Sequence, residues 1–223
     1  MTTTVDLYLD FVSPYVYLAL VQAEKFAADH GVELRPIPIV YGVVLDRTGL
    51  VGPVETAAKR QYTFRDVWRA ADLLGVPIAA PPEHPFRSLA ALRLLTAYRE
   101  DAAALPLARG LATAAWAEKR DLTDTSVLQE VADTAGAVRR PAAEVIHHPD
   151  VKLELRRATD AALEAGVFGV PTFALEGELF WGHDRLAHLA ARLQGQLSDS
   201  AGELNSVLRQ PRGAGRKGAP SRS

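Results

Sequence analysis

A serine stands at the point where a predicted strand gives way to a predicted helix, in the stretch DFVSPYVYLA of residues 10–19. Serine is a favoured helix N-cap, and the proline that follows Ser13 suits the first helical position. The unpaired N–H groups at that end of a helix favour an anion, so the Ser13 hydroxyl beside them can stabilise a thiolate without being one. The spacing alone favours the simpler interpretation, a helix cap.

The stretch GVFGVPTF, residues 166–173, holds a second candidate just before an apolar run. A cis bond between Val170 and Pro171 would form a tight turn that presents the backbone of Val170 outward. A backbone presented in this way can pair with a peptide-like ligand as an added strand. An ordinary trans turn is the alternative, and it is the commoner state of a bond before proline.

The stretch WGHDRL, residues 181–186, precedes a predicted helix near the C-terminal end. His183 or Asp184 can cap that helix, and a carboxylate there can also bind the ammonium group of a ligand. His183 can act as a general base, although a single histidine beside a helix start is weak support for that role. Capping is the simpler interpretation of both residues.

Two strands and a helix are expected to position Ser13. Residues 4–11, TVDLYLDF, alternate apolar and polar side chains with the period of a strand. The helix that starts after Ser13 is predicted to stop near His30–Gly31. VELRPIPIV at residues 32–40 then gives a second strand, whose prolines indicate an edge position or an early end. A strand–helix–strand unit of this length is expected to be parallel and right-handed.

Two short strands and a helix are expected to position the other candidates. VPTFALEGELFWG, which follows Gly169, reads as two strands that turn at Glu176–Gly177, and a helix from about His183 to Leu193 comes next. The order strand–helix–strand, followed later by strand–strand–helix, matches a thioredoxin fold whose two halves are separated along the chain.

The segment between the halves shows apolar residues at helical spacing in each of its longer stretches, with Gly or Pro between them. We therefore predict an α/β chain: a thioredoxin-like fold formed by residues 1–40 and 167–197, with an inserted all-helical domain at 41–166. Residues 198–223 are rich in Gly, Pro, Ser and Arg and are expected to form a disordered basic tail. A weak contact of this tail with nucleic acid or another acidic partner is the alternative.

The composition excludes several classes of chemistry. The 223 residues include no cysteine, which rules out disulfides, thiolate metal ligands and a redox dithiol of the protein's own. Any sulfur chemistry must therefore be borrowed from another molecule, and we expect no metal site. The 25 basic and 27 acidic residues nearly cancel, so we expect small molecules or proteins as partners rather than nucleic acid. No signal-like start or long apolar window is present, so we expect a cytoplasmic protein with no membrane partner.

Taken together, four stretches resemble a known family. The resemblance is to the 2-hydroxychromene-2-carboxylate isomerases and the related kappa-class glutathione transferases, of the DsbA-like thioredoxin superfamily. It is carried by DFVSPYVYLA, AAKRQYTFRDVWRAADLLGVP, HPFRSLAALRLL and VFGVPTFALEGELFWGHDRL. The similarity runs from about Val5 to Leu193, with the stretches in order and at the expected separations.

The resemblance implies a glutathione-binding enzyme that is usually a homodimer. In the family, the serine that matches Ser13 lies against the glutathione sulfur. The residue before the cis-proline, here Val170 before Pro171, pairs through its backbone with the tripeptide. The positions of His183 and Asp184 receive the γ-glutamyl end.

The resemblance also implies a substrate side. Lys59 and Arg60 fall on the family's basic pair, where cations hold a carboxylate. The family commonly has an asparagine where this chain has Arg87, and it often has a small or polar residue in place of His183. These departures bear on the substrate more than on the cofactor. Arg87 can add an anion contact, or it can lie solvated on a helix face.

We therefore expect a glutathione-dependent isomerase of a 2-hydroxychromene-2-carboxylate-like aromatic carboxylate, in which reversible addition of a thiolate allows rotation about a carbon–carbon bond. Ser13 is the expected catalytic residue. The expected cofactor-binding residues are Ser13, Val170, Pro171, His183 and Asp184, and the expected substrate-binding residues are Lys59, Arg60 and Arg87. A kappa-type glutathione transferase is the first alternative, since it needs the same activated sulfur. A non-catalytic thioredoxin-like protein that binds a thiol or peptide is the second.

Overall fold

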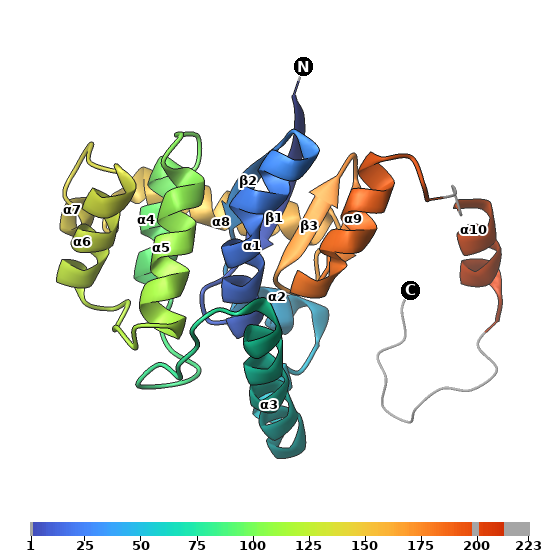
Figure 1. Cartoon of the computed structure of the whole chain (residues 1–223), viewed down its shortest axis with the longest axis horizontal. Helices are drawn as coiled ribbons and strands as arrows, with labels where there is room; N and C mark the ends of the chain where they lie inside the picture. Colours follow the sequence, from blue (N-terminus) through green and yellow to red (C-terminus); the bar gives the residue numbers. More distant parts are fainter. Residues whose placement is uncertain (1, 198–200, 212–223) are drawn as a thin grey trace.

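Four strands form one sheet in the order β2–β1–β3–β4 (Figure 1). The computed structural model describes residues 2–197 and 201–211. The bounds of the strands are β1 Thr3–Leu9, β2 Val32–Pro38, β3 Thr172–Leu175 and β4 Glu178–Trp181. β1 pairs with β2 in parallel and with β3 antiparallel, and β3 pairs with β4 antiparallel. The predicted parallel unit, the edge position of the proline-containing strand and the later hairpin are all confirmed.

The middle strand β1 is buried because its apolar side chains alternate. Val5, Leu7 and Leu9 are fully buried in the core, as the period-two pattern predicts. Leu7 lies opposite Pro36 of β2 on one side and Phe173 of β3 on the other. Since β1 is fixed on both sides, the turn that leaves its carboxyl end has a defined position.

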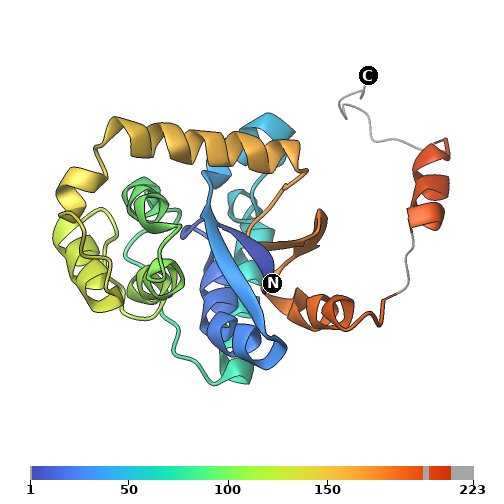
Figure 2. The same ribbon diagram turned by 90° about the horizontal axis from the view of Figure 1, so that it is seen from above.

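Helices cover both faces of this sheet. Helix α1 (Pro14–His30) and helix α9 (Leu186–Leu193) lie on one face, and α8 (Pro149–Glu164) crosses the other, as Figures 1 and 2 show from two directions. A short 3₁₀ helix, η2 (His183–Arg185), leads into α9. α1 begins at a proline and ends at Gly31, whose φ of 63° is the left-handed conformation that suits glycine at a helix end.

The chain between β2 and β3 forms helices and loops. Besides α8, its helices are α2 Tyr41–Thr48, η1 Pro53–Glu55, α3 Ala57–Leu74, α4 Leu89–Tyr98, α5 Ala104–Trp116, α6 Thr125–Ala135 and α7 Ala142–Val145. Helix α5 packs against α1, and a single hydrophobic core contains residues of both parts, such as Tyr17 and Trp116. The fold class, a thioredoxin-like fold with a helical insertion, is thus confirmed. The division into domains at residues 40/41 and 166/167 stays a proposal, because the core is continuous.

The C-terminal segment differs in part from its prediction. Residues Ala201–Arg209 form helix α10, which stands apart from the rest of the chain (Figure 1). The apolar side chains Leu204, Val207 and Leu208 recur at helical spacing and are exposed, a local pattern that the Gly- and Arg-rich composition of the whole tail obscured. The other parts of the predicted disordered tail, residues 198–200 and 212–223, lie outside the described residues.

The described residues contain neither a membrane-spanning helix nor a cluster of metal ligands. Within residues 2–197 and 201–211, no helix combines the length and the apolar character needed to cross a membrane. The same residues contain no cluster of three or more His, Asp or Glu side chains placed to hold a metal ion.

Candidate active site

Ser13 lies at the start of α1 with its side chain free of the capping role. Its backbone is extended, with φ −90° and ψ 122°, as an N-cap residue requires, but its hydroxyl makes no cap hydrogen bond. The Ser13 Oγ instead donates to the carbonyl oxygen of Val170 at 3.3 Å. The hydroxyl therefore faces the other half of the thioredoxin-like fold.

Val170 and Pro171 form the turn that meets Ser13. The bond between them is cis, so of the two conformations that the sequence left open, the structure has the turn and not the trans form. The Pro171 carbonyl accepts from the Gly182 N–H at 2.9 Å, which ties this turn to the segment before η2. Over the described residues, the Val170 N–H donates to no other group of the chain, so it is available to a peptide-like ligand.

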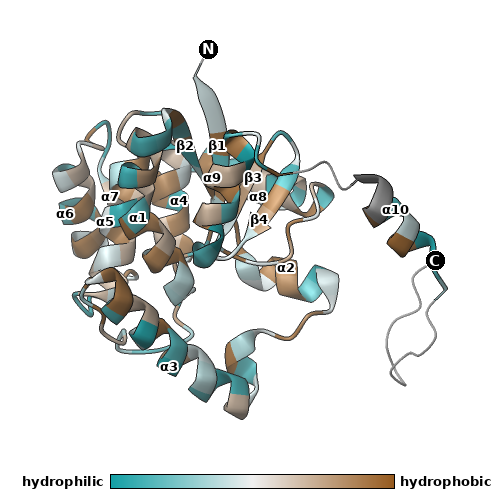
Figure 3. Cartoon of the chain, turned by 45° about the vertical axis from the view of Figure 1, so that its right-hand side comes forward, coloured by the Kyte–Doolittle hydropathy of each residue, from teal (hydrophilic) through white to brown (hydrophobic). Residues whose placement is uncertain are grey.

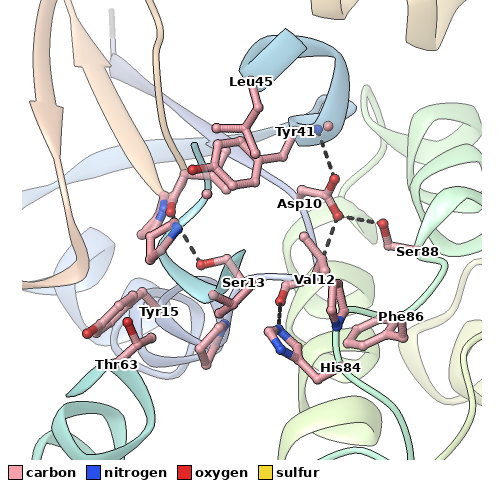
Figure 4. Close-up of a pocket in the computed structure, with 18 of the residues that line it drawn as sticks. Asp10, Val12, Ser13, Tyr15, Tyr41, Leu45, Thr63, His84, Phe86 and Ser88 are labelled. Atoms are coloured by element: carbon pink, nitrogen blue, oxygen red, sulfur yellow. Dashed lines mark hydrogen bonds between the residues drawn. The ribbon is translucent and has the colours of Figure 1, made fainter. Parts of the chain in front are cut away.

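A cavity of about 710 Å³ opens between these elements. Its walls come from the turn after β1, from α2 and α3, from the loop before α4, and from the segment around η2. Figure 3 shows that α2 and α3 both lie at the same end of the sheet. Figure 4 shows labelled side chains from the turn after β1, from α1, α2 and α3, and from the loop before α4 around one space. Six of the eight predicted site residues line it: Ser13, Arg87, Val170, Pro171, His183 and Asp184.

His183 and Asp184 lie on η2 at one side of the cavity. The His183 ring stacks on Tyr15, with ring centroids 5.3 Å apart and planes 9° from parallel. Burial lowers the pKa of His183, partly offset by the nearby carboxylates of Asp184 and Asp66. Asp184 forms an ion pair with Arg185 at 2.8 Å and is more than half exposed. Neither side chain caps α9, so both are available to a ligand.

The three predicted substrate cations are placed very differently. Lys59 is exposed on α3 and does not line the cavity. Arg60 does not line it either: its Nη1 donates to the His84 carbonyl at 3.0 Å, and its guanidinium lies 5.1 Å from the centre of the Phe64 ring. Arg87 does line the cavity and forms no ion pair with any residue that the structure describes. The structure thus brings one of the three cations to the site.

Asp10 is a site residue that the sequence did not single out. It is 2% exposed, and its carboxylate accepts hydrogen bonds from the Val12 N–H at 3.1 Å, the Tyr41 N–H at 2.9 Å and the Ser88 Oγ at 2.6 Å (Figure 4). Burial raises the pKa of Asp10, and these three donors act against the rise. The strand pattern gave no sign of this role, because Asp10 simply continues the polar alternation of β1.

His84 and Tyr15 also went unrecognised. His84 Nε2 lies 2.9 Å from the Val12 carbonyl oxygen, and burial lowers the pKa of this histidine. The Tyr15 hydroxyl donates to Asp66 at 2.7 Å, and burial raises the pKa of the tyrosine. His84 is the first residue of the motif HPFRSL, but the sequence alone does not distinguish it from a surface histidine. Its packing in the fold does.

The walls of the cavity divide into two chemical regions. Around Ser13 lie backbone groups and the start of α1, where an anion is favoured. The other region is apolar and aromatic, with Tyr41, Leu45 and Phe86 among its lining residues, and Arg87 also lines the cavity. Such a site suits a thiol at one end and an aromatic anion at the other.

Glutathione is a group that these residues can accommodate. The Val170 N–H is not used by the described chain, the Ser13 hydroxyl points into the same space, and the volume of about 710 Å³ is in the range of small-molecule sites. The carboxylate of Asp184 and the stacked ring of His183 offer contacts to a ligand ammonium and carboxylate. The donor set therefore fits a small peptide that brings its own thiol.

Comparison with known proteins gives consistent results. The DSBA-like thioredoxin domain family matches residues 4–194. A 2-hydroxychromene-2-carboxylate isomerase of Sphingobium xenophagum is 31% identical over 86% of this chain and 99% of its own. Glutathione S-transferase kappa 1 of Homo sapiens is 28% identical, over 84% of this chain and 89% of its own. A solved structure of a 2-hydroxychromene-2-carboxylate isomerase superposes with a TM-score of 0.79 at 28% identity, covering 93% of this chain and 100% of that one.

Proposed function

The chain belongs to the DsbA-like thioredoxin family and, within it, to the 2-hydroxychromene-2-carboxylate isomerases and kappa-class glutathione transferases, and we propose that it is a glutathione-dependent isomerase of an aromatic carboxylate. The observation that carries the proposal is the placement of Ser13. Its hydroxyl meets the Val170 carbonyl at the start of α1, where a redox relative would need a cysteine, and this chain has none.

Glutathione would be held by groups from both halves of the thioredoxin-like fold. The backbone of Val170 next to Pro171 would pair with the tripeptide as an added strand does. His183 and Asp184 would receive the γ-glutamyl end. When bound, glutathione supplies a thiolate that adds reversibly to an activated carbon–carbon double bond and so permits rotation about it.

The protein's own part is to favour the thiolate and to orient the substrate. The Ser13 hydroxyl can turn from the Val170 carbonyl and donate to sulfur. The start of α1, where the Tyr15 N–H has no acceptor among the described residues, adds a favourable field. Both effects lower the pKa of a thiol placed there. Arg87 would bind the substrate carboxylate, and the apolar wall formed by Tyr41, Leu45 and Phe86 would contact the ring.

A glutathione transferase of the kappa type is the second candidate, and the resemblance to the human kappa enzyme favours it. It would use the same activated sulfur on an electrophile that carries a leaving group. The deciding experiment is a turnover assay with 2-hydroxychromene-2-carboxylate and, separately, with a chlorinated aromatic acceptor, each with and without glutathione. Glutathione-dependent turnover of the chromene supports the isomerase. Turnover of the chlorinated acceptor alone would reject it in favour of the transferase.

A non-catalytic protein that binds a thiol or a peptide across Val170 and Pro171 is the remaining alternative. Calorimetry with glutathione separates it from a protein without a thiol site, and the turnover assay separates it from both enzymes. If neither wild type nor Ser13→Ala binds glutathione, the proposed function is rejected.

The proposal includes a homodimer in the cytoplasm, as in the expectation from the sequence. Sedimentation equilibrium of the purified full chain tests the dimer, and cell fractionation tests the location. A monomer at assay concentration would remove the dimer from the proposal.

A further inference from the structure

Residues 10–13, which we term the Ser13 loop, are held by side chains of the inserted segment. Two of its carbonyl groups accept hydrogen bonds from aromatic rings far along the chain. The Trp116 Nε1 donates to the Phe11 carbonyl at 2.8 Å, and the His84 Nε2 lies 2.9 Å from the Val12 carbonyl. Trp116 is fully buried, so this contact is shielded from water.

The Asp10 carboxylate at the start of the loop also accepts hydrogen bonds from the inserted segment. Asp10 accepts from the Tyr41 N–H at the start of α2 and from the Ser88 Oγ before α4. The third donor, the Val12 N–H, belongs to the loop itself. The loop that carries Ser13 thus has its carboxylate and two successive carbonyls fixed by the insertion. Figure 4 shows the contacts of Asp10 and of the Val12 carbonyl.

His84 can act in its contact with the Val12 carbonyl only as the hydrogen-bond donor. A carbonyl oxygen can only accept, so the Nε2 atom must carry the hydrogen and donate it to Val12. The Nδ1 atom is buried and has no partner among the described residues. The ring centroids of Phe64 and Trp116 lie 5.1 and 5.3 Å from that of the imidazole. Burial lowers the pKa of His84, which favours the neutral imidazole.

Arg60 supports the same contact from α3. Its guanidinium donates to the His84 carbonyl at 3.0 Å and lies over the Phe64 ring. This position explains why Arg60 does not reach the cavity. Two successive hydrogen bonds thus connect α3 to Val12, the neighbour of Ser13. The first runs from Arg60 to the His84 carbonyl and the second from the His84 ring to the Val12 carbonyl.

We propose that His84 is a positioning residue for Ser13: by donating to the Val12 carbonyl, it fixes the orientation of the Ser13 hydroxyl and of the Tyr15 N–H, which has no acceptor among the described residues, toward the sulfur. This inference rests on the proposed function, since it assigns His84 a role in placing the bound thiol. Small displacements at a reacting centre have large effects, up to about a hundredfold in rate for about 1 Å. A residue that holds the adjacent carbonyl can therefore act through Ser13, although His84 also lines the cavity.

The test is the pKa of the bound glutathione thiol, measured by the ultraviolet absorbance of the thiolate in full-length wild type, His84→Phe and His84→Gln. Because the chain contains no cysteine, glutathione supplies the only thiol in the sample. Phenylalanine keeps a ring among the neighbouring rings but cannot donate, whereas glutamine offers an amide N–H at a similar reach. Leu128→Ala, at a fully buried residue of α6, is the control for a general loss of stability.

We expect H84F to raise the bound-thiol pKa by about one unit and to lower kcat about tenfold below that pKa, with the KM for glutathione changed less than about threefold. H84Q should recover most of this loss, and L128A should leave the thiol pKa at the wild-type value. An unchanged thiol pKa in H84F, or an equal shift in L128A, would overturn the positioning role and leave the proposed function intact. If wild type itself does not bind glutathione, the proposed function fails and the positioning role falls with it.

A second measurement on wild type does not depend on the folding of H84F. At about pH 8, nitrogen-15 NMR of the His84 ring, assigned by its absence in H84Q, should show Nε2 protonated and Nδ1 without a proton. A bare Nε2 would overturn the inference, because it cannot donate to the Val12 carbonyl.

Discussion

The hydroxyl of Ser13 donates to the carbonyl oxygen of Val170 at 3.3 Å, across 157 positions of sequence. This contact joins the two halves of the thioredoxin-like fold at the cavity, and it leaves the Val170 N–H available over the described chain. A bound thiol would therefore meet a hydroxyl that, among the described residues, has one internal partner to give up, at the long distance of 3.3 Å. The predictions below follow from that arrangement.

Ser13→Ala should weaken catalysis more than binding. Loss of the hydroxyl removes a donor to the thiolate, so we expect kcat to fall about ten- to a hundredfold while the dissociation constant of glutathione changes less than about fivefold. Steady-state kinetics and calorimetry measure the two effects. Ser126→Ala, at an exposed serine in the first turn of α6, is the matched control. Equal kcat values in S13A and S126A would exclude a role for Ser13 in the reaction.

Arg87→Met should raise the KM of a carboxylate substrate about tenfold, because the guanidinium that lines the cavity would be lost. Lys59→Met removes a cation of the predicted pair that does not line the cavity, so its KM should stay at the wild-type value. The measurement is initial rate against substrate concentration at fixed glutathione. A larger rise in the substrate KM for K59M than for R87M would show that Lys59, and not Arg87, binds the substrate carboxylate.

Ser88→Ala should destabilise the fold in a pH-dependent way. The pKa of Asp10 is raised in the folded state, so Asp10 favours folding below its unfolded pKa and loses that contribution as the pH rises through its folded pKa. Removing the Ser88 donor makes the ionised carboxylate still less favourable. We expect a loss of about 1–3 kcal/mol at about pH 8 that shrinks as the pH falls through the folded pKa of Asp10.

Urea unfolding at about pH 8 and about pH 4 measures the difference between S88A and wild type. The control is Thr96→Val, since the buried Thr96 hydroxyl donates to the Leu92 carbonyl of its own helix rather than to a carboxylate. Its effect should be the same at both pH values. A pH-independent effect of S88A as well would show that Asp10 does not titrate as its surroundings indicate.

Truncation after Gln196 should leave the folded protein and its site unchanged. The described side chains of the removed part, Leu197 and residues 204–211, are all exposed, so little packing is lost. We expect the Tm to change by less than about 2 °C and the affinity for glutathione by less than about twofold. Calorimetry of the full and truncated chains tests both values. A large loss of either would assign the C-terminal segment a role in the fold or the site.

Much of the fold follows from local signals in the sequence. The alternation of Val5, Leu7 and Leu9 identified β1, and Ser13 before a proline identified the start of α1. The hairpin turn at Glu176–Gly177 is where both residues have positive φ, 52° and 85°, a conformation that glycine adopts readily. Each of these features depends on a few neighbouring residues, so a single sequence contains enough information to predict it.

The contacts that hold the site could not be predicted in this way. Asp10 looks like one more outward-facing polar residue of β1, yet helices α2 and α4 bring Tyr41 and Ser88 to it and bury it. The resemblance to the family predicts that Lys59 and Arg60 bind the substrate as a pair. Successive residues of a helix point about 100° apart, so these two side chains do not face the same wall of the cavity. Such outcomes depend on how distant elements pack, which no local pattern records.

The most direct test is a crystal structure of the protein with glutathione. We predict the sulfur within about 3.5 Å of the Ser13 Oγ, at hydrogen-bond distance for a sulfur acceptor, and the tripeptide backbone paired with the Val170 N–H. A sulfur bound away from Ser13, or a tripeptide that leaves Val170 without a partner, would contradict the account.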